Sequence, residues 1–440
     1  MGESIPPAGA ATTIADEPRA TPMARVAVSC LVGSAIEFYD FLIYGTAAAL
    51  VFPAVFFPNL TPGVAMIASM GTFATAFLSR PVGAAVFGYF GDRLGRKKTL
   101  VSTLLIMAVA TVSVGLVPST ASIGMAAPLI LMGLRLLQGF AVGGEWAGSA
   151  LLSAEYAPGD RRGRYGMFTL LGGGVAGVLS SLTFLGVNVT IGEYSPEFLQ
   201  WGWRIPFLIS SVLIALALYV RLNIEETPVF AEEKSRDLVP KAPLAEVFRL
   251  QGREILLAAG SVLCTMAFCY MGNTYLAMYA HTHLGYTRSF IWSVGVLSGL
   301  VSIATVVVSA GLCDRVGRRR LMLAGWAACV PWAFVVIPLI DTGNQALYAV
   351  AIVGTFAVSG IGSGPIGAFI PELFATRYRY SGSALAINLA GVLGGALPPL
   401  VAGTLLATYG SWSIGVMLAA LALTSLVCTY LLPETRGTTL

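Results

Sequence analysis

Charged side chains are scarce in this sequence: Asp, Glu, Lys and Arg make up 11% of its 440 residues, against 56% hydrophobic residues. The mean hydropathy is +0.79. A chain with so few charges cannot cover the surface of an ordinary water-soluble domain. The composition therefore excludes the soluble globular class and predicts a protein that lies largely within a membrane.

Residues for metal, redox or nucleotide chemistry are also few. The two histidines, His281 and His283, fall in one expected loop, and the six cysteines lie almost singly in apolar segments, with no CxxC pair. No GK[ST] phosphate-binding loop appears, so the sequence offers no site for ATP-driven pumping. A net charge of +4 implies no nucleic-acid partner. We therefore expect no catalytic residues, no metal site and no cofactor.

The sequence contains many long apolar runs. A bilayer-spanning helix needs about 20 mostly apolar residues. One set of such runs begins near Val26, Gly63, Thr99, Ile123, Tyr165 and Arg204. After a charged stretch, a second set begins near Ile255, Ser289, Leu321, Gln345, Ser381 and Ser411. These runs predict an all-α membrane protein with about twelve transmembrane helices.

The basic residues between these runs predict the orientation. Nearly all loop Lys and Arg fall in alternate connections, at 91–98, 160–164, 314–320, 376–379 and in the central charged stretch. The connections at 57–62 and 117–122 carry none. Because basic loops stay on the cytoplasmic side, both termini should be cytoplasmic. Residues 1–24 lack the features of a cleavable signal and are expected to form a disordered cytoplasmic tail.

The two sets of apolar runs share features that indicate a sequence repeat. Asp92 opens a basic loop after the second run, and Asp314 opens a similar loop after the eighth. Glu155 precedes Arg162 by the same interval as Glu372 precedes Arg379. Two features in matching register indicate a duplicated architecture of two bundles of about six helices. The expected boundaries are 1–24 for the N-terminal tail, 25–221 and 255–432 for the bundles, 222–254 for a cytoplasmic linker and 433–440 for the C-terminal tail.

Residues 88–98 (GYFGDRLGRKK) resemble the conserved cytoplasmic loop of the major facilitator superfamily. Further segments, from about Ala24 to the end of the chain, resemble its metabolite:proton symporter family: 36–41 (IEFYDF), 77–83 (FLSRPVG), 135–146 (RLLQGFAVGGEW), 201–207 (WGWRIPF), 226–230 (ETPVF) and 371–376 (PELFAT). Family members import shikimate, 2-oxoglutarate, citrate and related acids, or zwitterionic osmolytes such as proline and betaine. The resemblance implies a cavity between two bundles that rock to alternate access.

Glu37 and Asp40 are the first candidates for chemistry, because a charge inside a membrane span is costly and marks a functional site by default. They lie about one turn apart and so share a helical face. Two interpretations stay open: buried ion pairs with Arg80 and Arg135, or a proton carrier that works as access alternates. The resemblance favours the second, since family members carry acidic groups there. Glu145 is the third candidate for proton coupling.

The candidate substrate ligands divide between the halves. Arg80, Arg135 and Arg204 can each make a two-pronged contact with a carboxylate. For Arg204 the alternative is an anchor at the outer end of its helix. The neutral candidates, which supply hydrogen bonds and shape, are Tyr39, Gln138, Asn273, Tyr275, Tyr279 and Asn388.

The paired loops predict a cytoplasmic gate. Asp92 can accept hydrogen bonds at the N-terminus of a facing helix, and Arg93, Arg96 or Arg162 can pair with Glu155. Such contacts would latch the outward-facing state. The complete set of expected gating residues is Asp92, Arg93, Arg96, Glu155, Arg162, Asp314, Arg315, Arg318, Glu372 and Arg379.

These patterns predict a monomeric transporter of the cell inner membrane that imports a small organic acid, such as shikimate or a di- or tricarboxylate, with protons as the coupling ion. One alternative is proton-coupled import of proline or betaine. Against it, the sequence has no extended heptad tail like that of osmosensing relatives. An alternative from another class is a membrane receptor that binds its ligand without transport. The expected partners are the substrate, protons and the lipid bilayer.

Overall fold

The computed structural model describes residues 23–94, 96–192, 195–222 and 243–437, and the chain in these ranges is nearly all helix. It contains 12 helices that are long and apolar enough to cross a membrane. The predicted all-α membrane fold is therefore confirmed. The helix of the seventh span begins at Pro243, ahead of the expected start near Ile255. A non-helical backbone at Gln251 separates this leading segment from the span itself.

The first half of the chain forms the first six of these spans. Three short helices, α2 (Phe52–Phe56), α5 (Thr120–Ile123) and α9 (Pro196–Gln200), lie in its loops. The fourth span is made of α6 and α7, which meet at two consecutive glycines, Gly143 and Gly144. The spans are α1 (Met23–Leu50), α3 (Pro62–Leu94), α4 (Arg96–Leu116), α6 (Ala126–Val142) with α7 (Glu145–Tyr156), α8 (Arg162–Ile191) and α10 (Ile205–Leu222).

The second half forms the remaining spans, and two of these contain a π-helical turn. These turns are η3 (Met271–Tyr275) in the seventh span and η5 (Gly391–Ala396) in the eleventh. The matching helices of the first half, α1 and α8, carry no such turn. The helices are α12 (Pro243–Tyr270) with α13 (Leu276–Thr282), α14 (Arg288–Val316), α15 (Arg318–Asp341), α16 (Gln345–Ser363) with α17 (Ile366–Glu372), α18 (Arg379–Ala390) with α19 (Leu397–Tyr409), and α20 (Trp412–Leu431).

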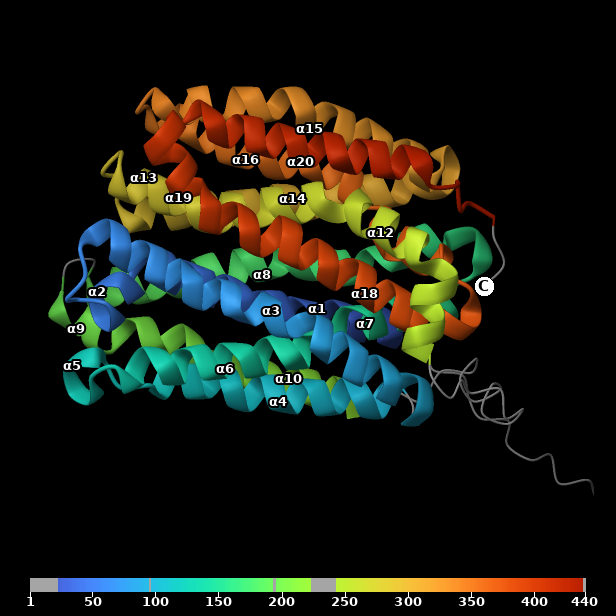
Figure 1. Ribbon diagram of the computed structural model, residues 1–440, viewed down its shortest axis with the longest axis horizontal. Helices are drawn as coiled ribbons and strands as arrows, with labels where there is room; N and C mark the ends of the chain where they lie inside the picture. Colours follow the sequence, from blue (N-terminus) through green and yellow to red (C-terminus); the bar gives the residue numbers. More distant parts are fainter. Residues whose placement is uncertain (1–22, 95, 193–194, 223–242, 438–440) are drawn as a thin grey trace, which may run out of the picture.

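The helices of both halves run side by side along the molecule (Figure 1). The halves meet where α8 packs against α14 and where α3 packs against α18. Small residues permit this close approach, as expected for helix packing in membranes. A Cβ atom on Gly367 of α17 would collide with the backbone of Gly166 on α8, and one on Gly299 would lie 2.9 Å from the backbone nitrogen of Val178.

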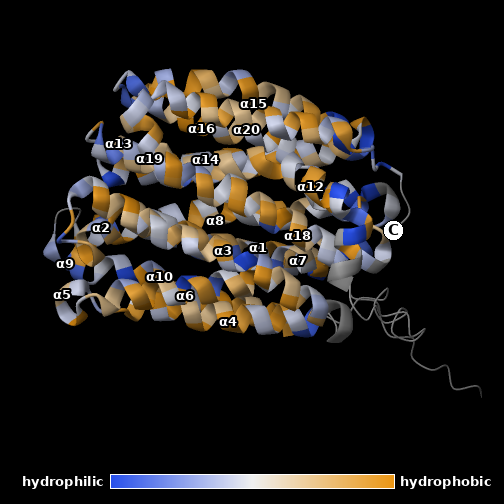
Figure 2. Ribbon diagram, in the orientation of Figure 1, coloured by the Kyte–Doolittle hydropathy of each residue, from blue (hydrophilic) through white to orange (hydrophobic). Residues whose placement is uncertain are grey.

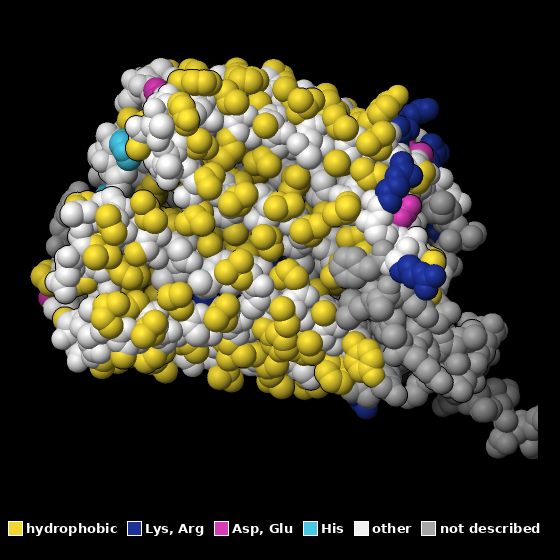
Figure 3. Space-filling view, in the orientation of Figure 1, with side chains coloured by type: hydrophobic (Ala, Val, Ile, Leu, Met, Phe, Trp, Pro, Cys, Tyr) yellow, Lys and Arg dark blue, Asp and Glu magenta, His cyan; other side chains and the backbone are white. Residues whose placement is uncertain are grey.

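The two ends of the bundle differ in charge. The helix sides are mainly hydrophobic and hydrophilic residues concentrate at the ends (Figure 2). Lys and Arg side chains gather at one end (Figure 3). This basic end carries the loops that join α3 to α4, α7 to α8 and α14 to α15. The opposite end carries the loops at 57–61, 117–125, 283–287 and 342–344.

Candidate functional site

Charged side chains lie buried in the interior of the first half. Glu37 and Asp40 of α1 are 4% and 0% exposed, and Arg80 of α3 and Arg135 of α6 are 5% and 0% exposed. Each side chain is carried inward by a helix that is long and apolar enough to cross a membrane. The structure thus buries Glu37 and Asp40, and two of the three predicted arginines.

Asp40 is joined to Arg135 by a chain of hydrogen bonds across three helices. Thr111 of α4 donates its hydroxyl to Asp40 Oδ2 at 2.7 Å. Gln138 donates from Nε2 to Thr111 Oγ1 at 2.6 Å and accepts from Arg135 Nη1 at 2.9 Å. All four side chains have zero exposure. Two neutral side chains therefore connect the carboxylate to the guanidinium.

Aromatic rings surround the two guanidinium groups. The Arg80 Cζ atom lies 4.0 Å from the centre of the Phe41 ring and 4.4 Å from that of Phe77. The Arg135 Cζ atom lies 3.9 Å from the Tyr44 ring centre and 4.5 Å from that of Phe41. Each such contact contributes ~0.5–2 kcal/mol. The rings therefore offset part of the cost of burying two cations.

Several polar atoms of this cluster have no hydrogen-bond partner in the part of the chain that the structure describes. They are Asp40 Oδ1, Arg80 Nε, and Arg135 Nε and Nη2. Tyr270, at the end of α12, lies next to Arg80, and its ring centre is 5.3 Å from that of Phe77. Leaving such a buried group unsatisfied costs ~1–3 kcal/mol, and more when it is charged. Groups of this kind usually bind water, an ion or a ligand. The arginines can donate to an anion, and Asp40 can accept a proton.

A cavity of about 80 Å³ lies between the two halves. Its walls come from α1, α7 and α8 on one side and from α12, α14, α16 and α18 on the other. The aromatic residues of the lining are Phe38, Trp146 and Phe356. Its hydroxyl and amide groups belong to Thr265, Asn273, Ser302, Ser359 and Ser363. None of the described residues that line this cavity is charged.

Arg80 does not line the cavity but reaches the second half about one helical turn from it. A Cβ atom placed on Gly391 would lie 3.2 Å from Arg80 Nη1, so the guanidinium reaches the second half at the π turn η5. Gly391 lies about one helical turn beyond Ile387, which lines the cavity. Glu37 directly precedes the cavity residue Phe38 along α1. The buried cluster and the cavity are therefore neighbours.

The other predicted residues of the first half lie in helix contacts. Glu145, at the start of α7, accepts a hydrogen bond from Thr103 at 2.8 Å. The Tyr39 hydroxyl donates to the carbonyl of Pro206 at 3.1 Å, between α1 and α10. Arg204 donates from Nη1 to the carbonyls of Gly115 and Val117 at 2.8 and 2.6 Å, at the opposite end. These contacts agree with the anchoring interpretation of Arg204.

The predicted residues of the second half are spread along the molecule. Asn273 lines the cavity and also a smaller one of about 30 Å³. Tyr275 is buried, and its hydroxyl has no hydrogen-bond partner among the described residues. Tyr279 donates to Asp341 Oδ1 at 2.8 Å near the opposite end. Asn388 donates to the Gly143 carbonyl at 2.8 Å, which joins the two halves. Only Asn273 among these four lines the cavity.

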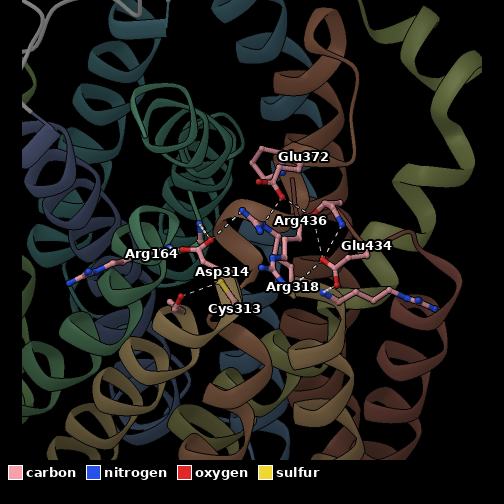
Figure 4. A network of polar contacts seen from close by, with 12 residues as sticks. Arg164, Cys313, Asp314, Arg318, Glu372, Glu434 and Arg436 are labelled. Carbon is pink, nitrogen blue, oxygen red and sulfur yellow. Dashed lines mark hydrogen bonds and ion pairs between the residues drawn. The ribbon is translucent and has the colours of Figure 1, made fainter. Parts of the chain in front are cut away.

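Asp314 makes the contact between halves that the loop repeat predicted for Asp92. Its two carboxylate oxygens accept from the backbone N–H groups of Gly163 and Arg164, each at 2.9 Å, at the N-terminus of α8 (Figure 4). An anion is favoured there by unpaired N–H groups and by the helix dipole. The side chains of Asp92, Arg93 and Arg96 lie outside the described residues, so their predicted contacts stay predictions.

The remaining gate residues form a network within the second half. Arg318 pairs with Glu372 at 2.7 Å and with Asp314 at 3.4 Å. Arg379 donates from Nε to the Pro371 carbonyl at 3.0 Å, next to Glu372. The ion pair with Arg318 therefore fixes the position of the Asp314 side chain, whose carboxylate accepts hydrogen bonds from α8.

Segment 433–437, in the expected C-terminal tail, joins this network. Glu434 accepts from the backbone N–H of Arg318 at 2.9 Å (Figure 4). The Arg436 side chain donates to the Arg315 carbonyl at 2.6 Å. In the first half, Glu155 directly follows the buried part of α7, which ends at Ala154, and Arg162 begins α8. The predicted Glu155–Arg162 pair stays a prediction.

The two halves also touch at the opposite end. Arg288 donates from Nη2 to the Leu50 carbonyl at 3.1 Å, and Asn188 donates to Ser289 at 2.7 Å. The Trp292 ring stacks on Phe184 with 5.4 Å between ring centres. At the basic end, Tyr380 donates to the Gly144 carbonyl at 2.5 Å. The cavity therefore lies between contacts of the two halves at both ends.

Sequence reasoning missed Thr111, Phe41 and Tyr270. A threonine in an apolar run carries no signal, because its hydroxyl can bond to its own helix. An aromatic residue in such a run resembles lipid-facing or core packing. Only the side-by-side placement of α1, α3, α4, α6 and α12 shows that these residues contact the charged cluster.

Comparisons with known proteins identify the family of this chain. The family model described as Major Facilitator Superfamily matches residues 30–399. The inner membrane metabolite transport protein YhjE of Escherichia coli is 39% identical over 97% of this chain and 98% of that protein. The E. coli shikimate transporter is 35% identical over 94% and 95%, and the proline/betaine transporter of Salmonella typhimurium is 34% identical over 84% and 75%.

Solved structures share the fold. The proton:xylose symporter XylE bound to 6-bromo-6-deoxy-D-glucose matches with a TM-score of 0.72 at 19% identity, over 95% of this chain and 97% of that chain. A partially occluded inward-open conformation of the E. coli xylose transporter matches with a TM-score of 0.74 at 18% identity, over 95% and 99%. At this identity the likeness establishes the arrangement of helices alone.

Proposed function

The chain belongs to the Major Facilitator Superfamily, and from that premise we propose that it imports a small organic acid together with one or more protons. The coarser statement is established by its relatives: it is a multi-pass membrane transporter of metabolites, not an enzyme. The proposal adds the charge class of the substrate. It also places the protein in the cell inner membrane, as a monomer with both termini in the cytoplasm.

One observation carries the proposal: Arg80 and Arg135 are buried with unsatisfied N–H groups, and Arg80 reaches Gly391, about one helical turn from the cavity residue Ile387. An anionic substrate would satisfy these donors with charge-assisted hydrogen bonds. Asp40 and Glu37 in the same cluster are suited to exchange a proton with the two sides in turn. The hydroxyl groups on the second half would contact the neutral part of the acid.

The proposal is tested by uptake into proteoliposomes with an imposed pH gradient. Radiolabelled shikimate, 2-oxoglutarate and citrate are compared with proline and betaine. We expect accumulation of at least one acid that requires the gradient and is abolished by a protonophore. Flux of an acid without dependence on the pH gradient would refute proton coupling. Binding without any flux would support the receptor alternative.

Import of a zwitterionic osmolyte is the second candidate. The cavity lining favours it in one respect, because Phe38, Trp146 and Phe356 can face a quaternary ammonium group, and no described lining residue is charged. Arg80 would then hold the carboxylate of betaine or proline. Accumulation of betaine or proline in the same assay, with none of the acids, would decide for this candidate.

A further inference from the structure

The hydrogen-bond chain in the first half assigns a role to Thr111, and we propose that it is the positioning residue that couples protonation of Asp40 to the anion-binding arginine Arg135. This inference rests on the proposed function, because it concerns the same site. Thr111 lies on α4 and does not line the described cavities. It is not one of the predicted gating residues. It acts through its two hydrogen-bonding neighbours.

The argument begins with the single proton of the Thr111 hydroxyl. Threonine can donate one hydrogen bond and accept two. Its oxygen accepts from Gln138 at 2.6 Å, and its proton points to Asp40 Oδ2 at 2.7 Å. The side-chain carbonyl oxygen of Gln138 in turn accepts a hydrogen bond from Arg135 at 2.9 Å. Every bond in the chain therefore has the direction that an ionised Asp40 requires.

Protonation of Asp40 removes the acceptor at the end of this chain. The proton, taken from water on the side to which the site is open, forms an O–H bond on the Asp40 carboxylate. If that bond forms at Oδ2, the new hydroxyl must donate where Thr111 now donates, so the Thr111 proton has to turn to another acceptor. Arg135 also loses the negative charge to which the chain connects it. Its orphaned N–H groups then favour an external anion more strongly.

The surroundings make Asp40 and Thr111 a local unit. Glu145, the other buried carboxylate near α4, has its own partner in Thr103 at 2.8 Å, about two turns along the helix. Thr111 therefore does not serve both carboxylates. The charged and titratable side chains near Asp40 on α1 and its neighbours are Glu37, Tyr39, Tyr44, Arg80, Arg135, Glu145 and Tyr270.

The test compares Thr111→Val, which keeps the shape but loses the hydroxyl, with Thr111→Ser, which keeps the hydroxyl. Thr355→Val is the matched control, because Thr355 is equally buried, also accepts from a neighbouring side chain, and lies far from the carboxylates. Each purified variant is assayed for gradient-driven accumulation, counterflow exchange, thermal stability and the pH profile of binding of the transported acid.

We expect Thr111→Val to lower gradient-driven accumulation at least tenfold while exchange stays within about threefold of wild type. Loss of the donor to ionised Asp40 should move the pH profile of acid binding to higher pH by about one unit. Thr111→Ser should show the gradient-driven accumulation and the pH profile of acid binding of the wild-type protein. A wild-type pH profile in Thr111→Val would overturn the inference, as would equal losses of exchange and accumulation with lowered thermal stability. Wild-type protein without gradient-driven uptake would instead refute the proposed function.

Discussion

Asp40 and Glu37 share a face of α1 but have different neighbours. Asp40 ends the chain of hydrogen bonds through Thr111, whereas Glu37 directly precedes the cavity residue Phe38. The spacing of the two carboxylates in the sequence did not distinguish them. Because Asp40 is fully buried and is linked to Arg135 through Thr111 and Gln138, it is the better candidate for the proton.

We expect Asp40→Asn to abolish gradient-driven accumulation and to retain counterflow exchange. An amide keeps the size of the carboxylate but cannot take up a proton, and exchange needs no net proton movement. The measurement is uptake with and without a pH gradient in proteoliposomes. Glu197→Gln, in the exposed helix α9, is the control for loss of a carboxylate. Loss of exchange together with accumulation in both Asp40→Asn and Glu37→Gln would indicate structural roles.

We predict that Arg80 decides the charge class of the substrate. Arg80→Lys keeps the charge but loses the planar contact with the rings of Phe41 and Phe77 and the two-pronged geometry. We expect it to weaken binding of the transported acid by ~1–3 kcal/mol, and Arg80→Gln to weaken it further. Binding is measured directly, with the acid and its uncharged amide.

The control for Arg80 is Arg204→Lys, since Arg204 bonds to backbone carbonyls at the opposite end. It should leave the preference for acid over amide unchanged. Wild-type protein that binds the amide as tightly as the acid would exclude recognition of the carboxylate by Arg80.

Among the helices, the N-terminus of α8 is the element most dependent on the other half. Its first turn donates two backbone hydrogen bonds to Asp314. Asp314 is in turn held by Arg318, which also pairs with Glu372. The basic loop after the eighth span therefore connects the two halves at this end, in addition to any effect of its charge on topology.

We expect Asp314→Asn to favour the state open at the basic end by about tenfold or more, because an amide can no longer accept two charge-assisted hydrogen bonds there. The measurement is labelling of single cysteines placed along the cavity, from each side of the membrane. Asp341→Asn is the control, since Asp341 bonds to Tyr279 and Ser411 within the second half. Unchanged labelling from both sides would remove Asp314 from the gate.

For the molecule as a whole, the separation of charge between its ends predicts its orientation. The loops and helix starts at the basic end carry Lys97, Arg161, Arg164, Arg319 and Arg320, and basic segments stay in the cytoplasm. Cysteines introduced at Arg164 and at Asn59 should be labelled from opposite sides of the membrane, with Arg164 reached only from the cytoplasm. Labelling of both from one side would contradict this topology.

The fold was largely predictable from the sequence, whereas the site was predictable only in its charged members. Apolar runs of sufficient length identify the spans, because a lipid environment requires each of them to be a helix. Buried charges such as Arg80 and Asp40 stand out in these runs because they are rare. Thr111 and Phe41 do not stand out, since the same residue types pack helices throughout the chain.

The sequence by itself determined the membrane class, the number of spans, the repeat and the identity of the buried charges. These features depend on local composition and on the cost of charge in lipid, which act on each segment separately. The tertiary structure decided which groups touch: that Asp40 reaches Arg135 through Thr111 and Gln138, and that Asp314 meets the N-terminus of α8. Hydrogen bonds act over about 3 Å, so these pairings exist only once helices distant in the chain are packed together.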